Sequence, residues 1–260
     1  ILVQVGTSST DNGGDVIVSG GDSTPLTGGS ISVSSGQGSQ TSSGAFVVRS
    51  VDAGTKGVSG MLAFVSGTTS SGTSGSITMA TGKAANGKGG DIILSVGSGN
   101  TGDGGNVLTS GGEISDKTGG AISLTGGYGS TTSSGSIVFQ TSNAGTAGTS
   151  GILLFSSGTT SSGASGSFSI QTGKATGGEG GDILVQVGTS STDNGGDVIV
   201  SGGDSTPLTG GSISVSSGQG SQTSSGAFVV RSVDAGTKGV SGMLAFVSGT
   251  TSSGTSGSIT

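Results

Sequence analysis

Residues 59–73 read SGMLAFVSGTTSSGT, and residues 150–164 read SGILLFSSGTTSSGA. The two stretches agree at 11 of 15 positions. Each begins with Ser-Gly, continues with alternating apolar residues such as Leu62 and Phe64, and ends in a tail rich in Gly, Ser and Thr. Apolar residues that recur with a period of two predict an extended strand with one buried face.

The same unit, which we call a rung, repeats along the whole chain. Its Gly-Gly or Ser-Gly doublets recur every 15 residues with one interval of 16 in six, so six rungs span 91 residues. Two such blocks span 182 residues, and residues 183–260 repeat residues 1–78 letter for letter. We therefore expect residues 1–260 to be one continuous segment of a longer array, with a six-rung block over 13–103, a second over 104–194 and a partial block over 195–260 that is identical to 13–78.

The rung length predicts the fold class. Fifteen residues are too few for a strand and a crossover helix, and no helical period of 3.6 is present. We predict an all-β fold, a single-chain parallel β-solenoid (β-helix) with 15-residue rungs, with left-handed turns at Gly36, Gly67, Gly82 and Gly97. An antiparallel meander of hairpins and a flexible Gly/Ser linker remain alternatives, although one apolar pair per rung favours the solenoid.

The composition excludes several classes of function. The chain has 60 glycines, two prolines, no Cys, His or Trp, and a net charge of −6. Disulfides, thiolate or imidazole zinc sites and a histidine base are therefore excluded, and the acidic charge argues against nucleic acid. No apolar run reaches the roughly 18 residues of a membrane span. We predict that the protein is not an enzyme, because a periodic chain lacks the asymmetry of an active site.

Some rungs are apolar on both sides of the expected strand. Water is an unfavourable neighbour for such a stripe. We predict that the stripe binds other copies of the chain laterally, with coverage by the chain's own loops or an apolar ligand as alternatives. Its residues are Val47, Met61, Ala63, Val65, Ile93, Val138, Ile152, Leu153 and Leu184.

Acidic residues flank two neighbouring Gly-Gly turns. Stacked rungs would bring four carboxylates together as a candidate calcium site with oxygen ligands, formed by Glu179, Asp182, Asp193 and Asp197. Residues 177–185, GGEGGDILV, fit a calcium-binding nonapeptide and resemble the calcium β-rolls of bacterial secreted repeat proteins. Solvated turn carboxylates are the alternative. The sister corner has Lys88 beside Asp91, so we expect it to balance its own charge without metal.

The whole chain resembles the giant Gly/Ser/Thr-rich tandem-repeat surface proteins and adhesins of aquatic microbes and microalgae. The resemblance implies a structural protein at the cell surface or outside the cell that self-assembles into a filament or protein fibril. An adhesin stalk, or a β-solenoid surface that binds ice or carbohydrate, is the alternative. Exposed Ser/Thr runs could carry O-glycans, whereas no Asn-x-Ser/Thr sequon is present.

Overall fold

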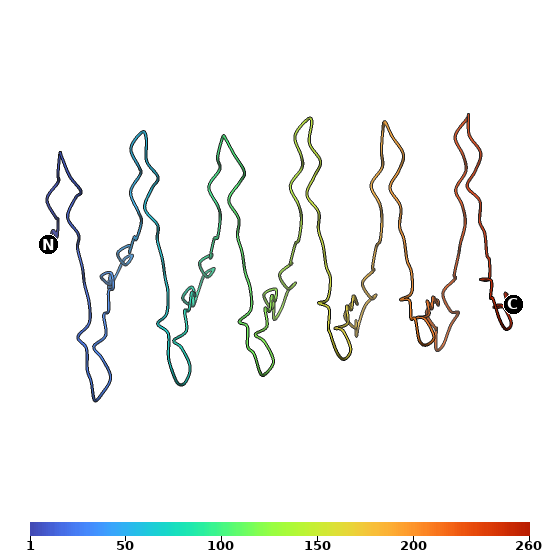
Figure 1. Cartoon of the computed structure of the whole chain (residues 1–260), viewed down its shortest axis with the longest axis horizontal. Coiled ribbons are helices and arrows are strands. Elements are labelled where there is room, and N and C mark those ends of the chain that lie inside the picture. Colours follow the sequence, from blue (N-terminus) through green and yellow to red (C-terminus); the bar gives the residue numbers. More distant parts are fainter. The chain divides into compact units, whose positions relative to one another are not determined.

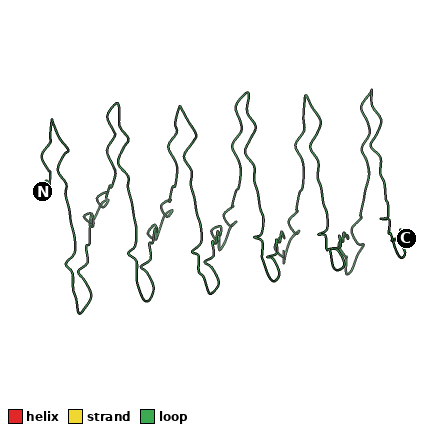
Figure 2. Ribbon diagram, viewed as in Figure 1, coloured by secondary structure: helices red, strands yellow, loops and turns green.

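The computed structural model describes all 260 residues and contains neither a helix nor a β-strand (Figure 2). The prediction of an all-β, single-chain parallel β-solenoid is therefore wrong. The physical reason is that the backbone forms only eight hydrogen bonds with itself, each between residues three or eight positions apart that close a turn or a loop, so none pairs two apolar segments as a sheet requires. No helix is present that could cross a bilayer.

Each rung has two parts, an extended connecting segment of five residues and a loop that runs out to a tip and returns (Figure 1). The loop is closed at a neck, where the second residue of the doublet meets a residue about nine positions earlier. A Cβ built on Gly75 would lie 3.7 Å from the Cβ of Ser66, and one built on Gly166 would lie 3.5 Å from the Cβ of Ser157. Connecting segments, necks and loops therefore alternate along the chain.

Sixteen necks are defined by such close contacts. In thirteen the two residues are nine positions apart, namely 5/14, 20/29, 35/44, 66/75, 81/90, 96/105, 111/120, 157/166, 172/181, 187/196, 202/211, 217/226 and 248/257. In three they are ten positions apart, namely 50/60, 141/151 and 232/242.

The necks whose two residues are ten positions apart show where the additional residue of each 16-residue rung lies. Their loops, 51–59, 142–150 and 233–241, are one residue longer, whereas the connecting segments keep five residues. The longer loop makes a turn of its own, in which the N–H of Gly57 donates to the carbonyl of Gly54 at 3.4 Å. Variation in rung length is thus confined to the loops.

One class of neck is made of glycine on both sides. A Cβ on Gly111 would collide with the carbonyl oxygen of Gly120, and the N–H of Gly120 donates to the carbonyl of Gly112 at 2.9 Å. The equivalent contact at Gly202 leaves 2.6 Å between a built Cβ and the carbonyl oxygen of Gly211. Glycine is required here because the two backbones are in direct contact.

The left-handed turns lie at other glycines than those predicted. Positive φ angles occur at Gly72, Gly102, Gly163 and Gly254, and at none of Gly36, Gly67, Gly82 and Gly97. These four follow the connecting segment at the start of a loop, whereas Gly72, Gly102, Gly163 and Gly254 lie further along it, at the bend. The carbonyl of Gly36 instead accepts the N–H of Gly44 at 2.9 Å, which needs no left-handed backbone.

Side-chain hydroxyl groups complete several loop tips. The Oγ of Ser8 accepts the N–H of Asp11 at 2.9 Å, and its copy Ser190 accepts the N–H of Asp193 at 3.0 Å. Such local bonds between a hydroxyl group and the backbone are typical of turns. The loops therefore satisfy part of their own hydrogen-bonding demand.

The chain has no core, since none of its residues is buried. The nine residues of intermediate exposure are all Gly, Ser or Thr in necks and loops. The residues divide into two units, Ile1–Gly127 and Tyr128–Thr260, and this division falls inside the block 104–194 and not at its boundary. Within both units, every large apolar side chain is exposed.

Candidate self-association surface

The connecting segments carry most of the apolar residues. Numbering each segment from 1 to 5, position 2 is apolar in all sixteen complete segments, from 15–19 to 243–247. Position 4 is apolar in fifteen, and the exception is Thr109. Position 3 varies from segment to segment, as Val47, Thr78 and Ser123 show.

Exposure distinguishes position 2 of each segment from position 3. Position 2 side chains are between 49% and 62% exposed, and the large apolar side chains at position 3 are between 74% and 92% exposed, whereas the apolar side chains at position 4 range from 48% to 77%. Side chains of an extended backbone alternate between its two sides, so positions 2 and 4 share one side. We call positions 2 and 4 the inner face, and positions 1, 3 and 5 the outer face.

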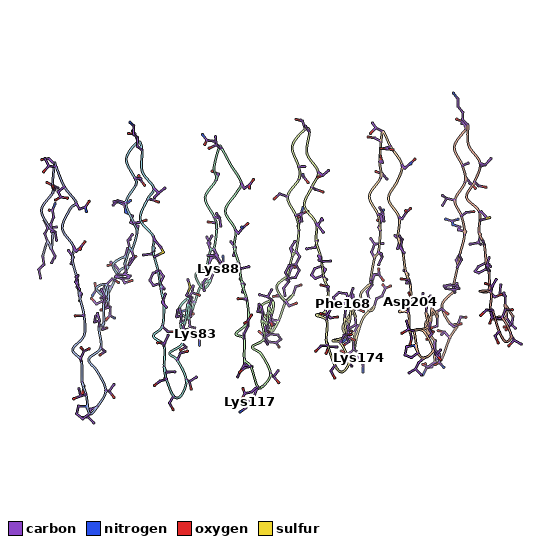
Figure 3. The ribbon with its side chains drawn as sticks, viewed as in Figure 1. Lys83, Lys88, Lys117, Phe168, Lys174 and Asp204 are labelled. Carbon is purple, nitrogen blue, oxygen red and sulfur yellow. The ribbon has the colours of Figure 1, made fainter.

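The inner faces of three consecutive segments meet through their aromatic rings. Phe139, Phe155 and Phe168 occupy inner positions of the segments 136–140, 152–156 and 167–171. The ring centroids of Phe139 and Phe155 lie 6.2 Å apart at an interplanar angle of 80°, and those of Phe155 and Phe168 lie 6.2 Å apart at 22°. These are favourable aromatic geometries. Three successive rungs thus direct their inner faces to one place; Phe168 is labelled in Figure 3.

The peptide groups of the connecting segments have no hydrogen-bond partner within the chain. All eight backbone bonds lie within loops and at necks, and every bond between a side chain and the backbone also lies in a loop. A buried peptide group without a partner is unfavourable. The segments therefore present open N–H and C=O groups together with apolar side chains.

Charged residues avoid the middle of the segments. Of the 22 charged side chains, 16 lie in loops, among them Lys83, Lys117, Lys174 and Asp204 of Figure 3. The other six occupy position 1 or 5 of a segment: Asp15, Arg49, Asp91, Asp182, Asp197 and Arg231. Positions 2 to 4 carry no charge in any segment, which leaves the inner face free of charge.

The residues of the predicted stripe lie on the outer face, with one exception. Val47, Ala63, Ile93, Val138 and Leu184 hold position 3, whereas Met61 and Ile152 hold position 1 and Val65 holds position 5. Leu153 is only 52% exposed and holds inner position 2, whereas Leu154 is 78% exposed. The assignment of Leu153 to the outer stripe is therefore wrong, because Ile152, like Met61, is the first residue after the neck glycine.

The structure does not gather the predicted calcium ligands. No group of three or more Asp, Glu, His or Cys residues is arranged to hold a metal. Glu179 lies in the loop 173–180 and Asp193 in the loop 188–195, while Asp182 and Asp197 begin connecting segments. Without stacked rungs, nothing holds these carboxylates side by side.

The sister corner forms an ion pair. The Nζ of Lys88 lies 2.9 Å from Oδ1 of Asp91, with the two side chains 80% and 62% exposed. The equivalent positions 91 residues later are Glu179 and Asp182, which carry like charges. A pair this exposed contributes little to stability.

No protein-family model, curated protein or solved structure matches this chain. The surface has no pocket. The inner and outer faces of the connecting segments are therefore the candidate functional surface.

Proposed function

We propose that this chain is a structural protein that forms an extracellular filament by binding other copies of itself. The observation that carries the proposal is that no residue is buried, although every connecting segment has apolar side chains. Soluble proteins rarely expose apolar side chains in every repeat without a partner that covers them. Binding to another molecule is the simplest way to remove these apolar side chains from water.

Repetition makes weak contacts between copies effective. Covering a half-exposed aliphatic side chain contributes about 1 kcal/mol. The same inner positions recur in sixteen segments of this chain, and linked contacts reinforce one another. Association should therefore strengthen steeply with the number of rungs, as a filament requires.

The surface left by the loops suits an environment outside the cell. The loops are rich in Gly, Ser and Thr and exposed throughout, and the chain has no cysteine, so its assembly is independent of redox conditions. Exposed loop residues such as Thr68, Thr69 and Ser70 are where O-linked sugars would attach.

Sedimentation velocity over a range of protein concentrations, combined with electron microscopy, tests the proposal. We expect the sedimentation coefficient to rise with concentration and filaments to appear, with monomers recovered in concentrated guanidinium. A chain that remains monomeric at every concentration would contradict self-association. A monomeric chain that binds ice or a polysaccharide would instead favour a binding surface on a stalk.

A further inference from the structure

We infer that copies of this chain pair through the inner faces and the backbones of their connecting segments, with the loops left at the surface of the assembly. The inference rests on the proposed self-association and names the surface that performs it. It replaces lateral contact through the outer stripe with contact through positions 2 and 4.

The inner positions carry apolar residues in every segment, whereas outer position 3 does not. Positions 2 and 4 together are apolar at all but one of their occurrences, the exception being Thr109. Position 3 is Ser or Thr in several segments, as at Ser32, Thr78 and Ser169. A contact that runs along every rung therefore fits the inner face. The convergence of Phe139, Phe155 and Phe168 shows that inner faces already meet across rungs.

The open peptide groups point to the same surface. Covering the inner face removes water from the neighbouring N–H and C=O groups, which then need new partners. An extended segment of another copy supplies complementary groups in a row, as in recognition by strand addition. Pairing of segments thus satisfies the backbone and covers the apolar side chains in one step, between chains and not within one chain.

The loops are unsuited to this contact. They close on themselves through bonds such as Gly120 N–H to Gly112 at 2.9 Å, and they carry 16 of the 22 charged side chains. Moving those charges away from water would be unfavourable. Loops at the surface keep the charges solvated.

The spacing of the segments identifies the partner as a second copy. A partner must offer apolar five-residue segments separated by loops of the same length, including the longer loops 51–59 and 142–150. This chain offers that spacing itself, and it repeats it letter for letter after 182 residues. Two copies can therefore match rung for rung over their whole length.

Single cysteines can distinguish the faces, because the natural chain has no cysteine. Thr109→Cys places a thiol at inner position 4 of the segment 106–110, and Ser123→Cys places one at outer position 3 of the segment 121–125. Ser115→Cys is the control in the loop 112–119. All three residues are exposed in the chain by itself, so protection must come from a partner. A water-soluble maleimide measures the reaction rate of each thiol in assembled protein and in guanidinium.

We expect the inner thiol of the assembled Thr109→Cys variant to react about tenfold or more slowly than the loop thiol, since labelling requires local opening. The outer thiol should react at the loop rate. An assembled sample in which the outer thiol alone is protected, in which both are protected, or in which all three react alike would overturn the inference while leaving self-association intact. Failure of all three variants and of the unsubstituted chain to assemble would overturn the proposed function as well.

Discussion

The connecting segments and the loops of a rung differ in whether their polar groups find hydrogen-bond partners within the same chain. In a loop, polar groups find partners a few residues away, as when the Oγ of Ser8 accepts the N–H of Asp11 at 2.9 Å. In a segment such as 152–156, the peptide groups have no hydrogen-bond partner, and every apolar side chain stays more than half exposed although Phe155 contacts two other rings. A loop therefore finds hydrogen-bond partners within its own chain, whereas a connecting segment does not.

The difference follows from the distance in sequence between partners. Closing a neck brings together residues nine or ten positions apart, which is a short loop with a small entropic cost. A segment could pair only with another rung or another chain, and here no other rung provides a hydrogen bond. Local polar chemistry therefore shapes the single chain, whereas the apolar side chains would be covered only in the proposed assembly.

The largest effect is expected from a charged side chain on the inner face of a connecting segment. Phe155→Asp should raise the concentration needed for half-assembly about 100-fold or more, because an unpaired buried charge is strongly unfavourable. Ser161→Asp in the loop 158–165 is the matched control and should leave assembly unchanged. Sedimentation velocity measures both. Equal assembly of the two variants would contradict the role of the inner face.

A proline distinguishes backbone pairing from side-chain contact. Ser123→Pro removes an N–H from the segment 121–125, and the loss of one buried hydrogen bond at about 1–3 kcal/mol should weaken assembly about tenfold to 100-fold. Asp116→Pro in the preceding loop is the control, since the equivalent residue 91 positions earlier is Pro25. The same sedimentation measurement applies. Should Ser123→Pro assemble like Asp116→Pro, backbone pairing would be refuted.

A neck substitution should affect the loop and spare the segment. Gly111→Ala places a Cβ against the carbonyl oxygen of Gly120, and overpacking of this kind costs about 1–3 kcal/mol. The amide of Gly120 should therefore exchange with deuterium about tenfold or more faster than in the unsubstituted chain. Gly112→Ala is the control, because a Cβ there has no atom within 4 Å. Unchanged exchange in Gly111→Ala would show that the neck is not closed.

The smallest effect is expected at the exposed ion pair. Lys88→Glu converts the pair with Asp91 into the like-charged arrangement of Glu179 and Asp182, and the change in stability should stay below about 1 kcal/mol. The midpoint of guanidinium-induced dissociation measures it. Lys83→Glu in the same loop is the control for a change in net charge. A shift much larger than that of the control would assign this corner a structural role.

Part of the surface could be predicted from the sequence and part could not. The alternation of Leu62 and Phe64 predicted a strand with one buried face, and the structure has neither a strand nor a buried residue. Side-chain alternation is local geometry, so it places the two side chains on one side of the segment but does not specify what covers them. Of the residues predicted for the stripe, Val47 and Val138 lie on the outer face, whereas Leu153 lies on the inner face, because one residue of register reverses the face. The solenoid was wrong because period-two alternation does not specify which other segment, if any, a strand pairs with.

The sequence by itself determined the period, the apolar pair in each rung and the absence of charge from that pair and from the residue between its members, since each of these follows from the order of residues. Only the tertiary structure decided that the Gly doublets close loops at necks, that left-handed turns fall at Gly72 and Gly163, and that the inner rings of Phe139, Phe155 and Phe168 meet. The tertiary structure also places Glu179 and Asp193 in two different loops that do not form a metal site. The turns and necks depend on the backbone conformation of each loop, and the ring contacts depend on distances between rungs; a one-dimensional repeat specifies neither.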